Sequence, residues 1–318
     1  MGGQYTRALP TIVFAGSASR DVTAEDPRGW RLGGAVSYGA LAAARLGMRT
    51  GAIVGVDSVA ARAAELDLLR MEGVDVIVVE LANGPVFDNR ETADGRVQHC
   101  LDAGEPLPVG AVPAGWEATK GWVLAPVADE LSDSWAGVPG PDAVIGLAWQ
   151  GLLRTLSSGE VVRRRPPAAS PFLERAGIVG VSVDDLDAGT EIDSLTALLG
   201  PESTLLLTRG AAGGLAISRL GAGSSVRRYP AVRAREAADP TGAGDVFLAA
   251  FVAAAIDASL TPGSGGGLGP PLRLAATAAS FTVERPGLLG VPGLEMVRRR
   301  MNQGRVETRS AARDARSG

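Results

Sequence analysis

The chain has 318 residues, of which 46% are hydrophobic, and a formal net charge of −4. This length and apolar content suffice for one large α/β domain, and the mildly acidic balance gives no reason to expect a nucleic-acid partner. With one cysteine, Cys100, and one histidine, His99, the chain offers no internal disulfide and no basis for a histidine metal site. The apolar runs are too short to span a bilayer and the N-terminus lacks an apolar signal core, so a cytoplasmic protein without a membrane partner is expected.

From the N-terminus, apolar strands alternate with helical patterns. Strands are expected at 10–16, 50–56 and 74–80, with helices at 33–47 and 58–72 between them. Further strands are expected near 121–125, 143–148, 177–181 and 203–208, with a helix near 184–199. Such alternation indicates a mostly parallel sheet with helices on both faces.

The stretch 85–113 interrupts this alternation. Two short polar-apolar runs, 86–91 and 96–101, flank Asp94-Gly95, a dipeptide typical of hairpin turns. Residues 21–32 could add a further strand. We expect an accessory β element that could close over a site and exclude water, although a purely structural hairpin fits the same pattern.

The last third of the chain continues with strands and two apolar helices. Residues 205–229 indicate a strand, a turn and two more strands, and helices are expected at 242–258 and 270–284. The Gly/Pro-rich stretch 261–271 predicts a flexible linker between these helices. The polar end from about residue 302 predicts a disordered tail (302–318) after a single domain of residues 1–301.

The most informative segment is Asp239-Pro-Thr-Gly-Ala-Gly-Asp245, which leads into the second-last helix. A helix start carries unpaired N–H groups and a positive dipole end, which suit an anion. A carboxylate at Asp245 would repel a bound phosphate unless it takes a proton from the group that attacks the phosphorus. This combination describes phosphoryl transfer to a hydroxyl, with an ordinary N-terminal helix acid as the structural alternative.

Other nucleotide-binding motifs fit the chain poorly. The dinucleotide fingerprint requires a glycine or alanine where Phe247 stands, and a strand before the loop. A P-loop or a protein-kinase fold requires a lysine on the phosphates, and the only lysine, Lys120, fits neither motif.

The motifs together resemble the ribokinase, or phosphofructokinase-B, family of small-molecule kinases over roughly residues 10–300. The segment Asp239–Asp245 is similar to its D-T-x-G-A-G-D signature, with the second residue changed. Gly16-Ser17 with Asp21 resembles the first-strand glycine and the substrate-binding acid, and Gly33-Gly34 resembles the di-glycine helix start. Thr208-Arg-Gly210 with Gly213-Gly214 resembles the segment that meets the nucleotide. Four such pieces occur in the expected order.

This resemblance implies a three-layer α/β/α ribokinase-like domain with a small β-hairpin lid, which transfers the γ-phosphate of ATP to an alcohol with Mg²⁺. Asp245 would be the general base, and the N–H groups of Gly242, Ala243 and Gly244 would form the anion hole. Asp21, Gly33 and Gly34 would bind the substrate, and Thr208, Gly210, Gly213 and Thr241 would bind the nucleotide. Asp239 could order the loop or hold a monovalent cation, and the sequence leaves both open.

The chain departs from the family at two places and has one feature of a particular branch. Tyr38 stands where many members have an asparagine that touches the sugar, so the substrate contact is altered. Ser182-Val-Asp-Asp185 replaces the N-x-x-E segment of the magnesium network, and Asp185 could hold a metal-bound water. Gln150-Gly-Leu-Leu-Arg154 resembles a pattern of the inositol-kinase-like branch and could face substrate or phosphate; a helix start with a surface arginine fits equally.

The sequence therefore predicts an ATP-dependent kinase of a small polyol, with a sugar or cyclitol favoured. A nucleoside kinase of the same family and a non-catalytic sugar- or nucleotide-binding relative are the alternatives. We expect a monomer or a homodimer.

Overall fold

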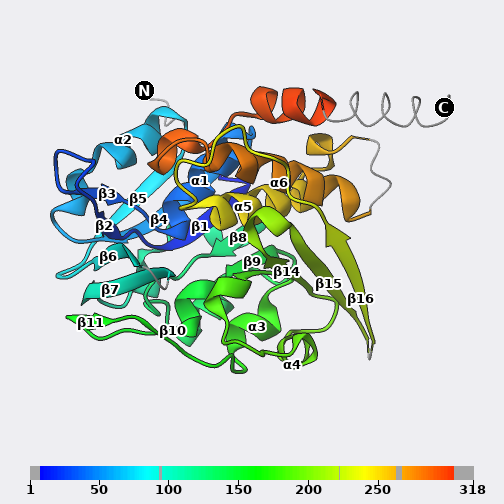
Figure 1. The fold of residues 1–318 in the computed structure, drawn as a ribbon, viewed down its shortest axis with the longest axis horizontal. Coiled ribbons are helices and arrows are strands. Elements are labelled where there is room, and N and C mark those ends of the chain that lie inside the picture. The colour runs from blue at the N-terminus through cyan, green and yellow to red at the C-terminus, as the bar shows by residue number, and fades with distance from the viewer. Residues whose placement is uncertain (1–7, 93–94, 222, 263–266, 304–318) are drawn as a thin grey trace, which may run out of the picture.

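The computed structural model describes residues 8–92, 95–221, 223–262 and 267–303 (Figure 1). Its main sheet has nine strands in the order β16-β15-β14-β13-β9-β8-β1-β4-β5. Seven strands run parallel to their neighbours: β1 (Ile12–Ser17), β4 (Thr50–Val56), β5 (Asp75–Glu80), β8 (Gly121–Leu124), β9 (Val144–Ala148), β13 (Ile178–Ser182) and β14 (Thr204–Thr208). β15 (Gly214–Leu220) and β16 (Gly223–Tyr229) extend the sheet as antiparallel strands. The expected mostly parallel sheet is confirmed.

Helices cover both faces of this sheet (Figure 1). One apolar core joins it to α1 (Ala35–Arg45), α2 (Ala64–Met71), α5 (Ala243–Ile256) and α6 (Gly269–Thr282). A second core on the opposite face holds α3 (Pro171–Arg175), α4 (Ile192–Ala197) and four tryptophans, Trp116, Trp122, Trp135 and Trp149. The arrangement is the expected three-layer α/β/α domain.

The order of the strands reverses at β1. The chain proceeds from β1 through β4 to β5 on one side, and from β8 through β9 and β13 to β14 on the other. A Cβ on Gly16 would lie 2.1 Å from the carbonyl oxygen of Ala125, so β1 and the end of β8 approach closely here. In open α/β sheets, ligands bind outside the carboxyl ends of the strands at such a reversal.

A small sheet of five strands lies beside the main sheet, in the order β11-β7-β6-β2-β3 (left in Figure 1). It combines the two expected segments: β2 (Arg20–Val22) and β3 (Trp30–Leu32) with β6 (Pro85–Thr92) and β7 (Gly95–Ala103). β11 (Glu160–Val161) and the ribbon of β10 (Arg154–Thr155) with β12 (Arg163–Arg164) were not anticipated. Asp94 of the expected turn lies outside the described residues.

The helix expected near 184–199 is wrong. A 3₁₀ turn at Val183–Asp185 and the short α4 replace it. Between them the N–H of Thr190 donates to the carbonyl of Asp187, which forms a turn around Gly189. Ser182 and Asp185 cap the start of the 3₁₀ turn reciprocally, but Leu186 has extended backbone and Gly189 has φ +89°, so the chain leaves the helical conformation after Asp185.

The C-terminal part follows the expected elements where it is described. α5 and α6 lie within two residues of their expected ends, and residues 294–303 are helical. Residues 263–266 of the expected linker and 304–318 of the expected tail lie outside the described residues. In the part of the chain that the structure covers, no helix has the length and apolarity needed to cross a membrane.

The close approach at Gly16 generates a stability prediction. Gly16→Ala places a methyl group against the backbone of Ala125, which cannot rotate away, so the free energy of unfolding should fall by about 1–3 kcal/mol. Gly110→Ala is the matched control, because a Cβ there meets no atom within 4 Å. Urea denaturation of both variants measures the difference, and equal midpoints would contradict the packing argument.

Candidate active site

The predicted site residues come from the carboxyl ends of neighbouring strands and from the start of α5. Asp21 lies in β2, shortly after β1, and Gln150 and Arg154 follow β9. Asp185 follows β13, and Thr208 ends β14. Because these strands are parallel, their ends meet at one edge of the main sheet, next to the reversal at β1.

The loop before α5 has the geometry of an anion site. Gly242 precedes the helix with φ +78°, a conformation that favours glycine, and Asp239 Oδ1 accepts the N–H of Thr241 at 2.9 Å. The N–H of Ala243 donates to the carbonyl of Pro240 at 3.2 Å. Within the described residues, the N–H groups of Gly242 and Gly244 have no such acceptor. Two of the three predicted donors can therefore face a ligand.

Asp245 lies in the first turn of α5, and the pKa of its carboxyl group is close to neutral pH. Desolvation raises its pKa to about 7, with a further increase from the Asp185 carboxylate, a decrease from the Arg154 guanidinium and a small increase from Asp21. These electrostatic contributions place three other predicted site residues, Asp185, Arg154 and Asp21, near the Asp245 carboxyl group. A general base is most effective when its pKa is close to the working pH.

Asp21 and the di-glycine segment lie in contact. Asp21 Oδ1 accepts a hydrogen bond from the Ser19 hydroxyl at 2.9 Å. A Cβ on Gly33 would lie 2.2 Å from Asp21 Oδ2, so the Gly33 backbone lies against this carboxylate. Gly34 then precedes α1. Three of the six residues predicted to bind the substrate, Asp21, Gly33 and Gly34, therefore lie close together before the start of that helix.

Tyr38 packs against Gly242 in the loop before α5, residues 239–242, which we call the anion loop. It is 2% exposed, and a Cβ on Gly242 would lie 2.2 Å from its ring. Burial raises the pKa of Tyr38 far above its usual range, with added increases from the carboxylates of Asp21, Asp239 and Asp245. The phenol therefore stays neutral and supports the loop. Its predicted contact with substrate stays a prediction.

Gln150 and Arg154 contact residues of two other segments, Asp185 after β13 and Phe87 in β6. Gln150 Nε2 donates to Asp185 Oδ1 at 2.5 Å, while Asp185 Oδ2 accepts the N–H of Ser182 at 3.2 Å. The Arg154 guanidinium lies 5.8 Å from the centre of the Phe87 ring in β6 and lowers the pKa of Asp245. Arg154 is thus part of the site's electrostatics.

The one predicted metal residue, Asp185, accepts a hydrogen bond on each carboxylate oxygen, from Gln150 Nε2 and from the Ser182 N–H. An ionised carboxylate has about four lone-pair sites, so these bonds leave it able to accept a further contact. In the described ranges no group of three or more His, Cys, Asp and Glu side chains could hold a metal ion. Mg²⁺ commonly keeps several waters and takes substrate phosphates as ligands. Contact with Asp185 through water fits this chemistry and stays a prediction.

The predicted nucleotide segment lies next to α5. The Thr208 hydroxyl donates to the carbonyl of Val181 at 3.4 Å, and Gly210 and Gly213 flank the 3₁₀ turn that follows. Tyr229, at the end of β16, stacks on Phe247 of α5 with 5.1 Å between ring centres. A Cβ on Gly213 would lie 2.2 Å from the Tyr229 carbonyl oxygen, so the turn between β14 and β15 is packed, through Tyr229, close to the helix that carries Asp245.

Two further residues organise the site and were not anticipated. Glu130 is buried, and its carboxylate accepts the N–H groups of Ser17 (2.7 Å), Val127 (3.0 Å) and Ala128 (2.8 Å), which joins the ends of β1 and β8. Arg31 in β3 lies 3.6 Å from Asp239 Oδ2. Both side chains act across long sequence separations, for which one sequence gives no signal.

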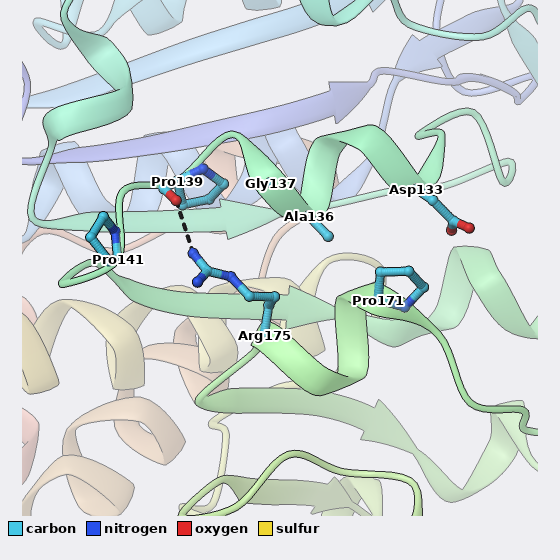
Figure 2. Close-up of a pocket in the computed structure, with 7 residues that line it drawn as sticks. All are labelled: Asp133, Ala136, Gly137, Pro139, Pro141, Pro171 and Arg175. Atoms are coloured by element: carbon cyan, nitrogen blue, oxygen red, sulfur yellow. Dashed lines mark hydrogen bonds between the residues drawn. The ribbon is translucent and has the colours of Figure 1, made fainter.

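A hollow elsewhere on the molecule has no connection with these residues. It has a volume of about 440 Å³ and lies between residues 133–141 and α3 (Figure 2). Arg175 crosses it to donate to the carbonyl of Pro139 at 2.9 Å. None of the predicted site residues lines it.

Known proteins share this architecture. Residues 179–292 match the model of the pfkB family of carbohydrate kinases, whereas no curated protein sequence matches the chain. A pyrophosphate-dependent kinase in the ribokinase family, complexed with a pyrophosphate analog and myo-inositol, has a TM-score of 0.69 at 17% identity over 90% of this chain and 99% of its own. The chain has the ribokinase fold.

Two other solved structures agree with this assignment. Ribokinase from Arabidopsis thaliana, complexed with ribose and ATP, has a TM-score of 0.64 at 19% identity over 92% of this chain and 99% of its own. Methanocaldococcus jannaschii nucleoside kinase has a TM-score of 0.62 at 16% identity over 92% and 98%. The predicted resemblance to ribokinase-fold kinases is confirmed, and the family match supports a carbohydrate kinase.

The position of Arg154 generates a pH prediction. If Asp245, with a pKa of about 7, is the base, kcat/KM should fall about tenfold per pH unit on the acid side of 7. Arg154 lowers that pKa, so Arg154→Gln should move the acid limb to higher pH. Arg163→Gln, an exposed arginine of the neighbouring β12, should leave the limb in place. A pH–rate profile unmoved by Arg154→Gln would contradict this role.

Proposed function

We propose that this protein is an ATP-dependent kinase that transfers the γ-phosphate to a hydroxyl of a small polyol, with a sugar or cyclitol favoured. The observation that carries the proposal is Asp245: a carboxyl group with a pKa of about 7, in the first turn of α5, beside the N–H groups of Gly242 and Gly244. A base next to an anion site is what transfer of a phosphoryl group to an alcohol requires.

In this mechanism Asp245 accepts the hydroxyl proton as the acceptor oxygen attacks the γ-phosphorus, and the bond to the leaving ADP breaks. Negative charge on the transferred group is stabilised by the Gly242 and Gly244 N–H groups and by the positive end of α5. The loop residue Thr241 and the turn with Thr208, Gly210 and Gly213 hold the donor. Asp185 would hold Mg²⁺ through water, and the ion would neutralise charge on the donor phosphates.

The charge of the site favours a neutral acceptor. Asp21 and Asp245 lie near the predicted acceptor position with Arg154 as the opposing charge, so a phosphorylated acceptor would meet repulsion from these carboxylates. The Asp21 carboxylate can accept two hydrogen bonds from vicinal hydroxyls, and Gln150 and Arg154 can contact others. A sugar or a cyclitol presents such hydroxyls.

Tyr38 and Asp245 argue against the two alternatives, a nucleoside kinase and a non-catalytic relative. A nucleoside acceptor would gain from an aromatic surface, but the Tyr38 ring is buried against Gly242, which favours a smaller polyol. A non-catalytic relative would have no chemical use for a base at Asp245. Pyrophosphate is a second candidate for the phosphate donor, because one kinase with this fold depends on pyrophosphate. A cytoplasmic location and a monomer or homodimer complete the proposal.

The decisive experiment measures ADP release from Mg-ATP across inositols, aminocyclitols, pentoses, hexoses and nucleosides. Asp245→Asn should lower kcat by roughly two to four orders of magnitude, the usual contribution of a general base, with the melting temperature of the protein preserved. Phosphate release from pyrophosphate is measured in parallel. Absence of acceptor-dependent turnover with either donor, while Mg-ATP still raises the melting temperature, would instead support the non-catalytic relative.

A further inference from the structure

The carboxylate of Asp239 stands in the loop that forms the anion site, and its charge requires compensation. Oδ1 accepts the N–H of Thr241, and the loop turns into Gly242 immediately afterwards. An uncompensated negative charge here would oppose the binding of a phosphate donor, because the two groups share one loop. A bound monovalent cation is one way to cancel it, as the sequence allowed.

The structure provides a side chain in that position instead. Arg31 reaches from β3 of the small sheet and places Nη1 3.6 Å from Asp239 Oδ2. Its guanidinium also pairs with Glu25 at 2.5 Å, which fixes its orientation from the outer side. A cation bound at Asp239 would meet this positive charge, so the residues present do not fit a monovalent-cation site there.

The same arginine lies between two loops. The N–H groups of Ala238 and Asp239 both donate to the carbonyl of Val283, at 2.8 and 3.1 Å, which joins the anion loop to the segment after α6. Arg31 Cδ lies 3.7 Å from where a Cβ on Gly287 would stand, so its stem passes over the second loop while its head group faces the first. Arg31 and Asp239 side chains are 22% and 21% exposed, so solvent screens the pair only in part.

We propose that Arg31 is a positioning residue that takes the place of a monovalent cation at Asp239, so that donor binding is independent of K⁺. The inference rests on the proposed kinase activity for its kinetic readout. It predicts that removal of the guanidinium leaves the Asp239 charge exposed to the donor and opens a space that a small cation can enter.

The test compares KCl with tetramethylammonium chloride at equal ionic strength. The wild-type protein should have the same melting temperature and the same KM for Mg-ATP in both salts. Arg31→Ala should raise that KM by about fivefold to tenfold in tetramethylammonium, with kcat less affected, and KCl should restore both KM and melting temperature. Arg31→Lys should behave more like the wild type.

Two variants make the result specific. Arg90→Gln removes another arginine of the small sheet, whose partner is Asp88, and should acquire no K⁺ response. Asp239→Asn keeps an oxygen acceptor for the Thr241 N–H but removes the charge, so Arg31→Ala in that background should have little further effect on KM. The Asp239→Asn background also allows the effect of Arg31→Ala to be tested if the single Arg31 variant fails to fold.

The proposal is overturned if the wild-type protein responds to K⁺ as strongly as Arg31→Ala does, or if Arg31→Ala shows no K⁺ response and a wild-type KM. The melting temperatures in the two salts require no turnover. If no acceptor is phosphorylated, they still decide whether Arg31 replaces a cation, and failure of the proposed kinase activity stays distinguishable from failure of this inference.

Discussion

The proposed site depends on one electrostatic conflict: a carboxylate lies beside the predicted binding position of an anion. Asp245 lies in the first turn of α5, and Asp239 lies in the loop that leads into this helix. The molecule offsets these charges with different means. Burial keeps Asp245 partly protonated near pH 7 and Arg154 limits that effect, while Arg31 faces Asp239. Without such compensation, the positive end of the helix would be countered by its own acids.

The strand reversal at β1 supplies the place for this arrangement. Gly16 lets β1 approach the end of β8, and the buried Glu130 carboxylate then accepts N–H groups from both segments. Burial raises the pKa of Glu130, because the interior disfavours a charged carboxylate. The hydrogen bonds from backbone N–H groups lower this pKa and so stabilise the charged form. These contacts hold the ends of the two strands together next to the site.

The sequence predicted the main sheet because apolar periodicity and glycine positions are local signals; β4 was expected at 50–56 and begins and ends at those residues. It also predicted Asp21, Asp245, Asp185 and Arg154, which lie together because parallel strands end at one edge. It failed at 184–199, where the extended backbone of Leu186 and the turn from Asp187 to Thr190 interrupt the helix. Arg31, Phe87 and Glu130 gave no signal, since their partners lie far away in the sequence. The packing of Tyr38 on Gly242 was equally invisible, because it depends on how α1 meets the loop before α5.

The small sheet takes part in this charge balance as well as in covering the site. Arg31 extends from β3 to Asp239, and Phe87 of β6 lies next to the guanidinium of Arg154, which acts on Asp245. β2 pairs with both β3 and β6 and carries Asp21, so the three contributions belong to one hydrogen-bonded unit. A shift of this sheet would therefore change the compensation of Asp239, the basicity of Asp245 and the position of the predicted acceptor contact together. In the proposed kinase this coupling would give the accessory β element a chemical role, because the small sheet carries Arg31, Phe87 and Asp21 and so bears both on the charge balance and on the predicted acceptor contact.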